Sequence, residues 1–165
     1  MNHSLPSSEE LEELLDLAVD LSSQAAEVHF RRQTGHIDSK STATDPVSQV
    51  DRDAERIITA GIGRARPDDG ILGEEETDTQ GNSGLRWVSD PLDGTVNYLY
   101  GFSSHSMSIA VELDDVPIIG VVYDTAHDEM YVARIDGTTT KTGHNVQVTS
   151  CKDLSIALLG TGFAY

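Results

Sequence analysis

The chain has little cysteine, no long apolar run and no targeting signal. Cys151 is the single cysteine among 165 residues, so no disulfide can form within the chain and a reducing compartment is expected. The longest apolar stretch, Val116 to Tyr123, is far too short to cross a bilayer. The N-terminal segment is acidic and lacks the apolar core of a signal peptide. Together these absences predict a soluble, cytoplasmic protein.

Basic residues are also scarce. Lys and Arg number 11, against 28 Asp and Glu, which gives a formal net charge of −17. Such a surface repels nucleic acid and anionic lipid, so neither is expected as a partner. It also repels a phosphorylated substrate. A phosphate site on this chain would therefore need bound cations, which clustered carboxylates can recruit.

Several catalytic motifs are missing. No G-x-x-x-x-G-K-[ST] sequence occurs, which excludes a P-loop NTPase. Ser104 and Ser106 flank His105 but form no nucleophile elbow, which argues against a serine hydrolase. The histidines lack H-x-H or H-E-x-x-H spacing, and we interpret them as surface or loop residues, which disfavours zinc and favours an all-oxygen Mg²⁺ site. They are His3, His29, His36, His105, His127 and His144.

The N-terminal third of the sequence has helical periodicity. Ser7 to Glu10 has the pattern of a capping box, and the apolar spacing after it predicts a long amphipathic helix that ends before Gly35. Residues 36–47 are polar and should form a loop or hairpin. A second helix is predicted from about Asp51 to Ile62, followed by a turn at 66–70.

Beyond residue 70 the pattern changes to strands, with Asp114-Asp115 as a hairpin turn. Helices followed by a meander of strands predict an α+β fold, with two N-terminal helices packed on a largely antiparallel β-sheet. The length suits one domain. Strands are predicted at residues 71–73, 85–89, 106–113, 116–123, 129–134, 146–148 and 154–161.

The segment Asp90 to Asn97, D-P-L-D-G-T-V-N, gives the strongest chemical signal. Its first Asp ends a strand-like run, its second follows a proline turn, and Gly94-Thr95 resembles the start of a helix. The carboxylates are hard ligands for a divalent cation, and the backbone N–H groups beside them can hold a phosphate. An Asx-turn is the alternative interpretation. The strand end and the stiff proline favour the metal site.

Three further positions join this hypothesis. Glu74-Glu75-Glu76 follows an apolar strand, so Glu74 can project into a cleft with Asp90 and Asp93, although most acidic triplets are solvated loops. Three converging carboxylates would make a two-cation site plausible. Asp51 alone suggests a helix cap, and Thr95 an ordinary first-turn residue. Paired in space, they could orient and deprotonate a metal-bound water.

At these residues the chain resembles the inositol monophosphatase family of metal-dependent, lithium-sensitive phosphatases. The family pattern K-x-S-x-x-D-x-V-[ST]-x-x-D is matched by Lys40 to Asp51, and the G-E-E motif by Gly73 to Glu75. W-x-x-D-P-[IL]-D-G-T-x-N-[FY] is matched by Trp87 to Tyr98, and G-V-V-Y by Gly120 to Tyr123. Order and spacing agree from about Leu11 onward, which makes the combination specific.

The resemblance implies a metal centre. Glu74, Asp90 and Asp93 would be ligands, with Asp90 bridging two Mg²⁺ ions and the carbonyl of Leu92 completing one coordination sphere. Glu75 would lie in the surrounding shell or near a third, weaker ion.

The same resemblance implies catalytic and substrate-binding roles. Asp51 and Thr95 would activate the attacking water. Asp93, Gly94 and Thr95 would contact the substrate, with the N–H groups of the last two holding the phosphate. Family members are commonly homodimers.

The sequence departs from the family pattern in three places. Ser48 stands where Thr is frequent, and residues 137–148 lack the usual G-x-G-A-x-x-N-G form, so that turn should be rebuilt. The sequence stops at Tyr165, about where the family's second half, with its last ligand Asp, begins. We therefore expect residues 1–165 to be one N-terminal inositol-monophosphatase-like domain, incomplete at its C-terminus: the N-terminal half of a layered αβαβα phosphatase fold.

The first functional hypothesis is Mg²⁺-dependent hydrolysis of a small phosphate monoester, with inositol monophosphate as the preferred substrate. Histidinol phosphate, fructose bisphosphate and a phosphoadenosine nucleotide are alternatives within the superfamily. A truncated, non-catalytic cation-binding module is the alternative from another class. The expected partners are a small phosphorylated substrate and either a second copy of the chain or a complementing C-terminal half.

Overall fold

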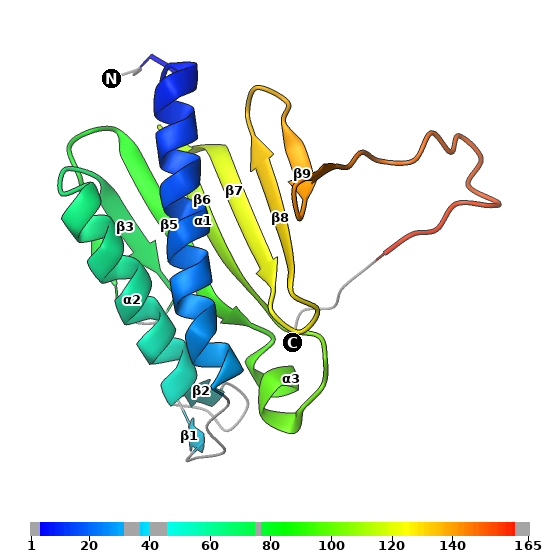
Figure 1. Ribbon diagram of the computed structural model, residues 1–165, viewed down its shortest axis with the longest axis horizontal. Coiled ribbons are helices and arrows are strands. Elements are labelled where there is room, and N and C mark those ends of the chain that lie inside the picture. Colours follow the sequence, from blue (N-terminus) through cyan, green and yellow to red (C-terminus); the bar gives the residue numbers. More distant parts are fainter. Residues whose placement is uncertain (1–3, 32–36, 40–45, 75–76, 161–165) are drawn as a thin grey trace.

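Two long helices lie next to each other on one face of a curved sheet, and a short third helix lies at the end of that sheet (Figure 1). The computed structural model describes residues 4–31, 37–39, 46–74 and 77–160. The helices are α1 (Ser8–Phe30), α2 (Gln49–Ala65) and α3 (Thr95–Tyr100). None of the helices in these ranges is both long enough and apolar enough to cross a bilayer.

The main sheet has eight strands in the order β10-β9-β8-β7-β6-β5-β3-β4. Each neighbouring pair is antiparallel except β3 with β5, which is parallel. The predicted α+β class, with two helices on a largely antiparallel sheet, is therefore confirmed. The strands are β3 (Gly70–Gly73), β4 (Asp78–Thr79), β5 (Leu85–Asp93), β6 (Ser106–Leu113), β7 (Val116–Asp124), β8 (Glu129–Arg134), β9 (Thr139–Lys141) and β10 (His144–Asn145). A separate antiparallel pair joins β1 (Ile37–Ser39) to β2 (Pro46–Ser48), as a hairpin at 36–47 predicted; residues 40–45 lie outside the described ranges.

Helix α1 starts where the capping box predicted. The Ser7 hydroxyl accepts a hydrogen bond from the N–H of Glu10 at 3.2 Å, and the Glu10 carboxylate accepts one from the N–H of Ser7 at 2.8 Å. Each bond satisfies an N–H group that the helix itself leaves unpaired. The buried stripe that follows has helical spacing and faces the sheet. It consists of Leu11, Leu14, Leu15, Ala18, Leu21, Ser22, Ala25, Ala26 and His29.

The core lies between the two helices and the three central strands. Trp87 of β5, Ile109 of β6 and Val121 of β7 are fully buried beneath α1 and α2. The helices approach closely at Gly61, where a Cβ atom would lie 2.1 Å from a methyl carbon of Leu21. Glycine at this position of α2 therefore lets the two helices pack at short range.

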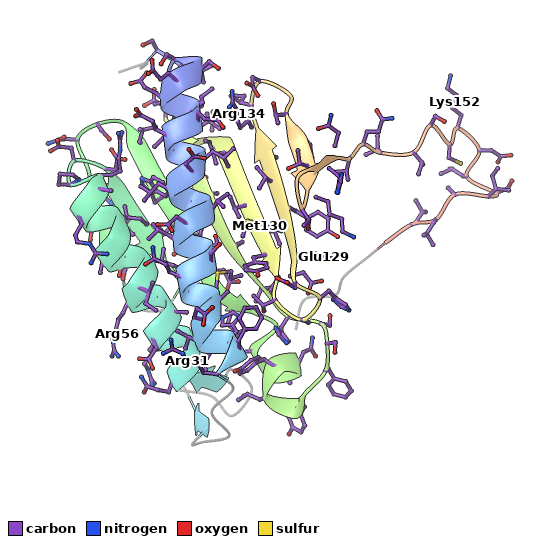
Figure 2. The ribbon with its side chains drawn as sticks, viewed as in Figure 1. Arg31, Arg56, Glu129, Met130, Arg134 and Lys152 are labelled. Carbon is purple, nitrogen blue, oxygen red and sulfur yellow. The ribbon has the colours of Figure 1, made fainter. Side chains whose placement is uncertain are left out.

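Ion pairs join the far part of the sheet to α1. The Arg134 side chain of β8, labelled in Figure 2, is only 9% exposed. It pairs with Glu12 of α1 and with Asp136. At the hairpin between β6 and β7, Asp114 and Asp115 have φ angles of 48° and 65°. Two successive positive φ values are typical of a type I′ turn, whose twist suits antiparallel strands, as the Asp-Asp pair predicted.

Two predicted strands are wrong. Residues 146–148 and the described part of 154–161 have no strand structure, and the chain there leaves the body as an extended arm that carries Lys152 (Figures 1 and 2). Alternation alone did not place 146–148 in the sheet, because the ladder ends at β10. The arm's apolar side chains, Leu154, Ile156, Leu158 and Leu159, are 75–100% exposed. The predicted turn at residues 90–93 is instead the end of β5.

Asp69 holds the turn between α2 and β3. Its carboxylate is buried and accepts hydrogen bonds from Trp87 Nε1 at 2.9 Å, from Arg66 Nε at 2.9 Å and from the Ser83 hydroxyl at 2.7 Å. The Trp87 indole is itself fully buried, so its N–H needs this acceptor.

Replacing Asp69 by Ala should therefore destabilise the fold. We expect Asp69→Ala to lower the free energy of unfolding by about 2–4 kcal/mol, because the indole N–H would be left unpaired in the core. Urea unfolding monitored by the fluorescence of Trp87 would measure this loss. Asp68→Ala, at the exposed neighbouring side chain, is the control and should change stability by less than about 1 kcal/mol. Equal stability of the two variants would contradict the assigned role.

Candidate active site

The predicted site residues gather at the carboxyl end of β5. The pairing of β5 with β6 is regular up to Asp90 and resumes at Asp93, with a shift of register between them. Such a bulge bends a strand and redirects its side chains. The end of β5 therefore presents Asp90 and Asp93 differently from the regular alternation upstream, and Asp93 is exposed while Leu92 is buried.

The structure brings Asp51 and Thr95 together. Asp51 lies in the first turn of α2 and is only 1% exposed, and Thr95 is the first residue of α3. The Thr95 hydroxyl lies 3.1 Å from Asp51 Oδ1 and 2.9 Å from the carbonyl oxygen of Leu92. One hydroxyl has one proton, so Thr95 can donate a hydrogen bond to one of these acceptors and accept a hydrogen bond from a third group. This is the contact that the water-activation hypothesis requires.

Glu74 and Asp90 form a second pair. Their side chains lie close enough to interact, and Asp90 Oδ1 accepts a hydrogen bond from the backbone N–H of Leu92 at 3.1 Å. Burial raises the pKa of Asp90 above its usual value. The Glu74 side chain and the N–H of Leu92 oppose this rise, and the nearby charges of Asp93 and Asp51 add to it. Four carboxylates thus lie close enough to affect one another.

The donor set suits a hard cation. Carboxylates that lie close together, as Glu74 and Asp90 do, repel one another unless a proton or a cation lies between them. A divalent cation supplies such a positive charge, and magnesium prefers oxygen ligands. Among the residues that the structure describes, no group of three His, Cys, Asp or Glu side chains is close enough to hold a metal ion together. The structure thus brings Glu74, Asp93 and Asp51 close enough to act on Asp90 without a compact cluster of three ligands among the described residues, and Glu75 lies outside the described ranges.

Gly94 sets the start of α3. Its φ is 83°, a left-handed conformation that favours glycine, and no side chain caps the helix there. A Cβ atom at this position would lie 2.8 Å from the carbonyl oxygen of Ser104. Beside it lies a polar cavity of about 320 Å³, whose lining includes Asp93, Gly94, Asn97 and His105.

The glycine of the G-E-E motif also has a steric reason. A Cβ atom on Gly73 would lie 2.5 Å from Glu55 Oε1, because the buried Glu55 carboxylate packs against this strand. Glu55 Oε1 accepts from the N–H of Thr77 at 3.0 Å and from its hydroxyl at 2.7 Å. Sequence analysis missed Glu55. The signal was its position four residues after Asp51, within the buried stripe of α2.

The interpretation of all histidines as surface or loop residues is wrong for His29. It lies in α1, is 3% exposed, and bonds Thr125 Oγ1 through Nδ1 at 3.0 Å and the Pro91 carbonyl through Nε2 at 2.9 Å. Its place four residues after the buried Ala25 was the available signal. His127 and His144 are exposed as predicted and His105 is half-buried in a loop, while His3 and His36 lie outside the described ranges.

Substitution of Gly94 should test the backbone at this site. We expect Gly94→Ala to lower the free energy of unfolding by about 1–3 kcal/mol, because the left-handed φ and the Ser104 contact both oppose a Cβ atom. Gly63→Ala is the matched control, since nothing lies within 4 Å of its Cβ position in α2, and it should be neutral or slightly stabilising. Denaturant unfolding of the two variants would measure this difference. A free energy of unfolding in Gly94→Ala equal to that of the wild type would contradict a strained backbone at this position.

The pH dependence of the free energy of unfolding should reveal the lowered pKa of His29. Burial lowers its pKa to about 4, from 6.5 when exposed, so the unfolded chain binds this proton more readily than the folded chain. Stability is therefore full above pH 6.5 and is lost as the pH falls towards 4. From about pH 7 to about pH 5 the loss from this group should be about 1–2 kcal/mol.

His29→Gln should lack this contribution, although it is less stable at every pH. The measured quantity is the difference in unfolding free energy between the two pH values for each variant. His144→Gln, at an exposed position, serves as the control and should keep the wild-type difference. An identical pH dependence in wild type and His29→Gln would disprove the assignment.

The chain matches a family model and many known proteins. The model of the inositol monophosphatase family matches residues 10–165. Inositol-1-monophosphatase of Mycobacterium leprae is 40% identical over 140 residues, which cover 79% of this chain and 48% of that protein. Histidinol-phosphatase of Chlorobaculum parvum is 34% identical over 144 residues, which cover 86% of this chain and 55% of that protein.

Solved structures agree with the fold. SuhB of Mycobacterium tuberculosis is 35% identical and superposes with a TM-score of 0.76, over 93% of this chain and 59% of that one. The extragenic suppressor protein suhB of Bartonella henselae gives a TM-score of 0.80 at 31% identity, over 84% of this chain and 55% of that one. The chain spans about half the length of the curated relatives it matches. By its sequence motifs, its sheet order and these matches, the chain belongs to the inositol monophosphatase family.

Proposed function

We propose that this chain provides the metal and water-activating half of a Mg²⁺-dependent phosphatase that hydrolyses a small phosphate monoester. The observation that supports this most strongly is the contact of Thr95 Oγ1 with Asp51 Oδ1 at 3.1 Å, together with the interacting Glu74 and Asp90 carboxylates nearby. A proton acceptor and a set of oxygen donors therefore meet at the end of one strand. Family membership supports the same reaction class.

The proposed ligands are Glu74, Asp90, Asp93 and the Leu92 carbonyl, for two Mg²⁺ ions, with Glu75 near a third and weaker position. Magnesium, when bound, would supply positive charge to the phosphate oxygens and to the attacking water. Asp93 and Gly94 would orient the substrate, which the adjacent polar cavity can admit.

Proton transfer is the task of Asp51 and Thr95. The hydroxyl of Thr95 can accept a proton from water while it donates its own to Asp51, and the buried carboxylate holds the hydroxyl in that orientation. The Leu92 carbonyl competes for the same hydroxyl proton at 2.9 Å. If a ligand bound the Leu92 carbonyl oxygen, Asp51 would remain as the acceptor for the Thr95 hydroxyl proton.

For the substrate we propose inositol monophosphate. Relatives named inositol-1-monophosphatase are 37–43% identical, and the relative named histidinol-phosphatase is 34% identical. Histidinol phosphate is therefore the second candidate to assay. We also propose a cytoplasmic location, a single domain over residues 1–165, and completion of the site by a second copy or by a segment equivalent to the rest of the relatives.

A second candidate function is a cation-binding module without turnover. It is favoured by the finding that the described residues contain no cluster of three acidic or histidine ligands, and by the coverage of only about half of each relative. This module would bind Mg²⁺ but release no phosphate.

The assay that separates the two is phosphate release from inositol 1-phosphate and from histidinol phosphate, with and without Mg²⁺. We expect Mg²⁺-dependent release by the wild-type chain and a loss of about 100-fold or more in Asp93→Asn, because a ligand and substrate contact is removed. Asp16→Asn, at an exposed site on α1, makes the same charge change and should retain full activity. Equal background from wild type and Asp93→Asn, together with Mg²⁺ binding by calorimetry, would support the module instead.

A further inference from the structure

A chain of buried hydrogen bonds leads from a loop at the edge of the polar cavity to the backbone of the site. His105 Nδ1 lies 3.1 Å from Thr125 Oγ1, which lies 3.0 Å from His29 Nδ1. His29 Nε2 lies 2.9 Å from the carbonyl oxygen of Pro91. The four residues come from the loop after α3, the turn after β7, the end of α1 and the end of β5, so the chain joins four separate segments.

The chemistry of each atom fixes the direction of these bonds. The Pro91 carbonyl can only accept, so His29 Nε2 must hold a proton and donate it. Burial keeps His29 neutral near pH 7, so its Nδ1 accepts and the Thr125 hydroxyl donates to it. That hydroxyl has no second proton, so His105 Nδ1 donates to Thr125. The geometry therefore assigns one tautomer to each imidazole.

The far end of the chain holds a peptide plane from two sides. The carbonyl of Pro91 and the N–H of Leu92 belong to one planar peptide unit. His29 Nε2 donates to the Pro91 carbonyl oxygen at 2.9 Å, while the Leu92 N–H donates to Asp90 Oδ1 at 3.1 Å. Rotation of this unit would break both bonds together, so the orientation of the Asp90 carboxylate depends on His29.

The surroundings keep this arrangement rigid. His29 and Thr125 are 3% and 6% exposed, and the Tyr98 hydroxyl donates to the backbone carbonyl of His29 at 3.0 Å. The rings of Tyr98 and His105 meet edge to face, with centroids 5.1 Å apart. The side chains of His29 and Thr125 are therefore mostly shielded from bulk solvent, although both line a cavity of about 240 Å³.

We propose that His29, Thr125 and His105 are positioning residues, which fix the Pro91–Leu92 peptide so that Asp90 is oriented for a cation. This inference rests on the proposed function for the identity of the cation, Mg²⁺, but the hydrogen-bond chain can be tested without it. His105 lines both the cavity beside Asp93 and a second cavity of about 240 Å³. The outer end of the chain is thus placed where a ligand in either cavity would meet it.

The first test is the tautomer of each histidine, measured by ¹⁵N NMR at about pH 8 on the full 165-residue chain. We expect the Nε2–H form at His29 and the less common Nδ1–H form at His105. Thr125→Val, which keeps the shape and removes the hydroxyl, should abolish the Nδ1–H preference at His105, and Thr125→Ser should restore it. An Nε2–H form at His105 in the wild type would overturn the directed chain.

The second test reads the peptide unit itself. We expect the Leu92 amide to exchange with solvent about tenfold faster in Thr125→Val than in wild type, and at the wild-type rate in Thr125→Ser. His105→Gln breaks the chain at its half-buried end, where the fold is least affected, and should shift the same amide in the same direction. An unchanged Leu92 amide in a folded Thr125→Val or His105→Gln would show that the residues only fill space, and would overturn the proposal.

Calorimetric titration with MgCl₂ then tests whether the chain of hydrogen bonds affects the affinity of the site for Mg²⁺. The Kd for Mg²⁺ should rise several-fold in Thr125→Val and stay at the wild-type value in Thr125→Ser and in the remote control Thr59→Val. An unchanged Kd in Thr125→Val would overturn the positioning role. If the wild type bound no Mg²⁺, the proposed function would fail, while the Leu92 exchange rates would still decide whether the chain orients Asp90.

Discussion

The repulsion among carboxylates at the end of β5 is the constraint on which the site depends. Asp90 is partly buried and interacts with the Glu74 side chain and with the charges of Asp93 and Asp51, all of which act on its pKa. Folding brings these groups together at a cost, since like charges in a partly buried site destabilise one another. A protein keeps such an arrangement only where the rest of the fold holds it in place, and clusters of this kind are typical of functional sites.

The supports come from elements that are distant in the sequence. Glu55 of α2 packs on Gly73, at the end of strand β3 directly before Glu74. The buried Asp69 stabilises the turn that precedes this strand. His29 of α1 holds the peptide after Pro91. The two helices therefore do more than cover the core, because each also places one polar side chain under the site. This explains why buried polar residues lie in otherwise apolar stripes.

The sequence was sufficient for the parts of the structure that depend on local patterns. The capping box at Ser7, the apolar stripe of α1 and the turn at Asp114-Asp115 all have short-range causes, and all were predicted. Asp51 and Thr95 are 44 positions apart, so local patterns suggest only a helix cap and a first-turn residue, and the family resemblance was needed to favour their pairing. The bonds of His29 span 62 and 96 positions, and nothing local announces such partners. The prediction of a strand at 146–148 was wrong because it used only local alternation of apolar residues. A strand also needs a neighbouring strand to pair with, and residues 146–148 have none in the main sheet.

Charge balance gives the order in which ligands can bind. Asp51, Glu74, Asp90 and Asp93 bring up to four negative charges to a chain whose net charge is already −17. A phosphate monoester adds about two more near pH 7, so it cannot approach this pocket before cations do. Two divalent ions would cancel the four carboxylates. The phosphate would then meet a neutral pocket beside the start of α3, where the N-terminal end of the helix favours its oxygens. A surplus of acidic residues is thus compatible with the proposed phosphorylated substrate if the metal ions bind before it.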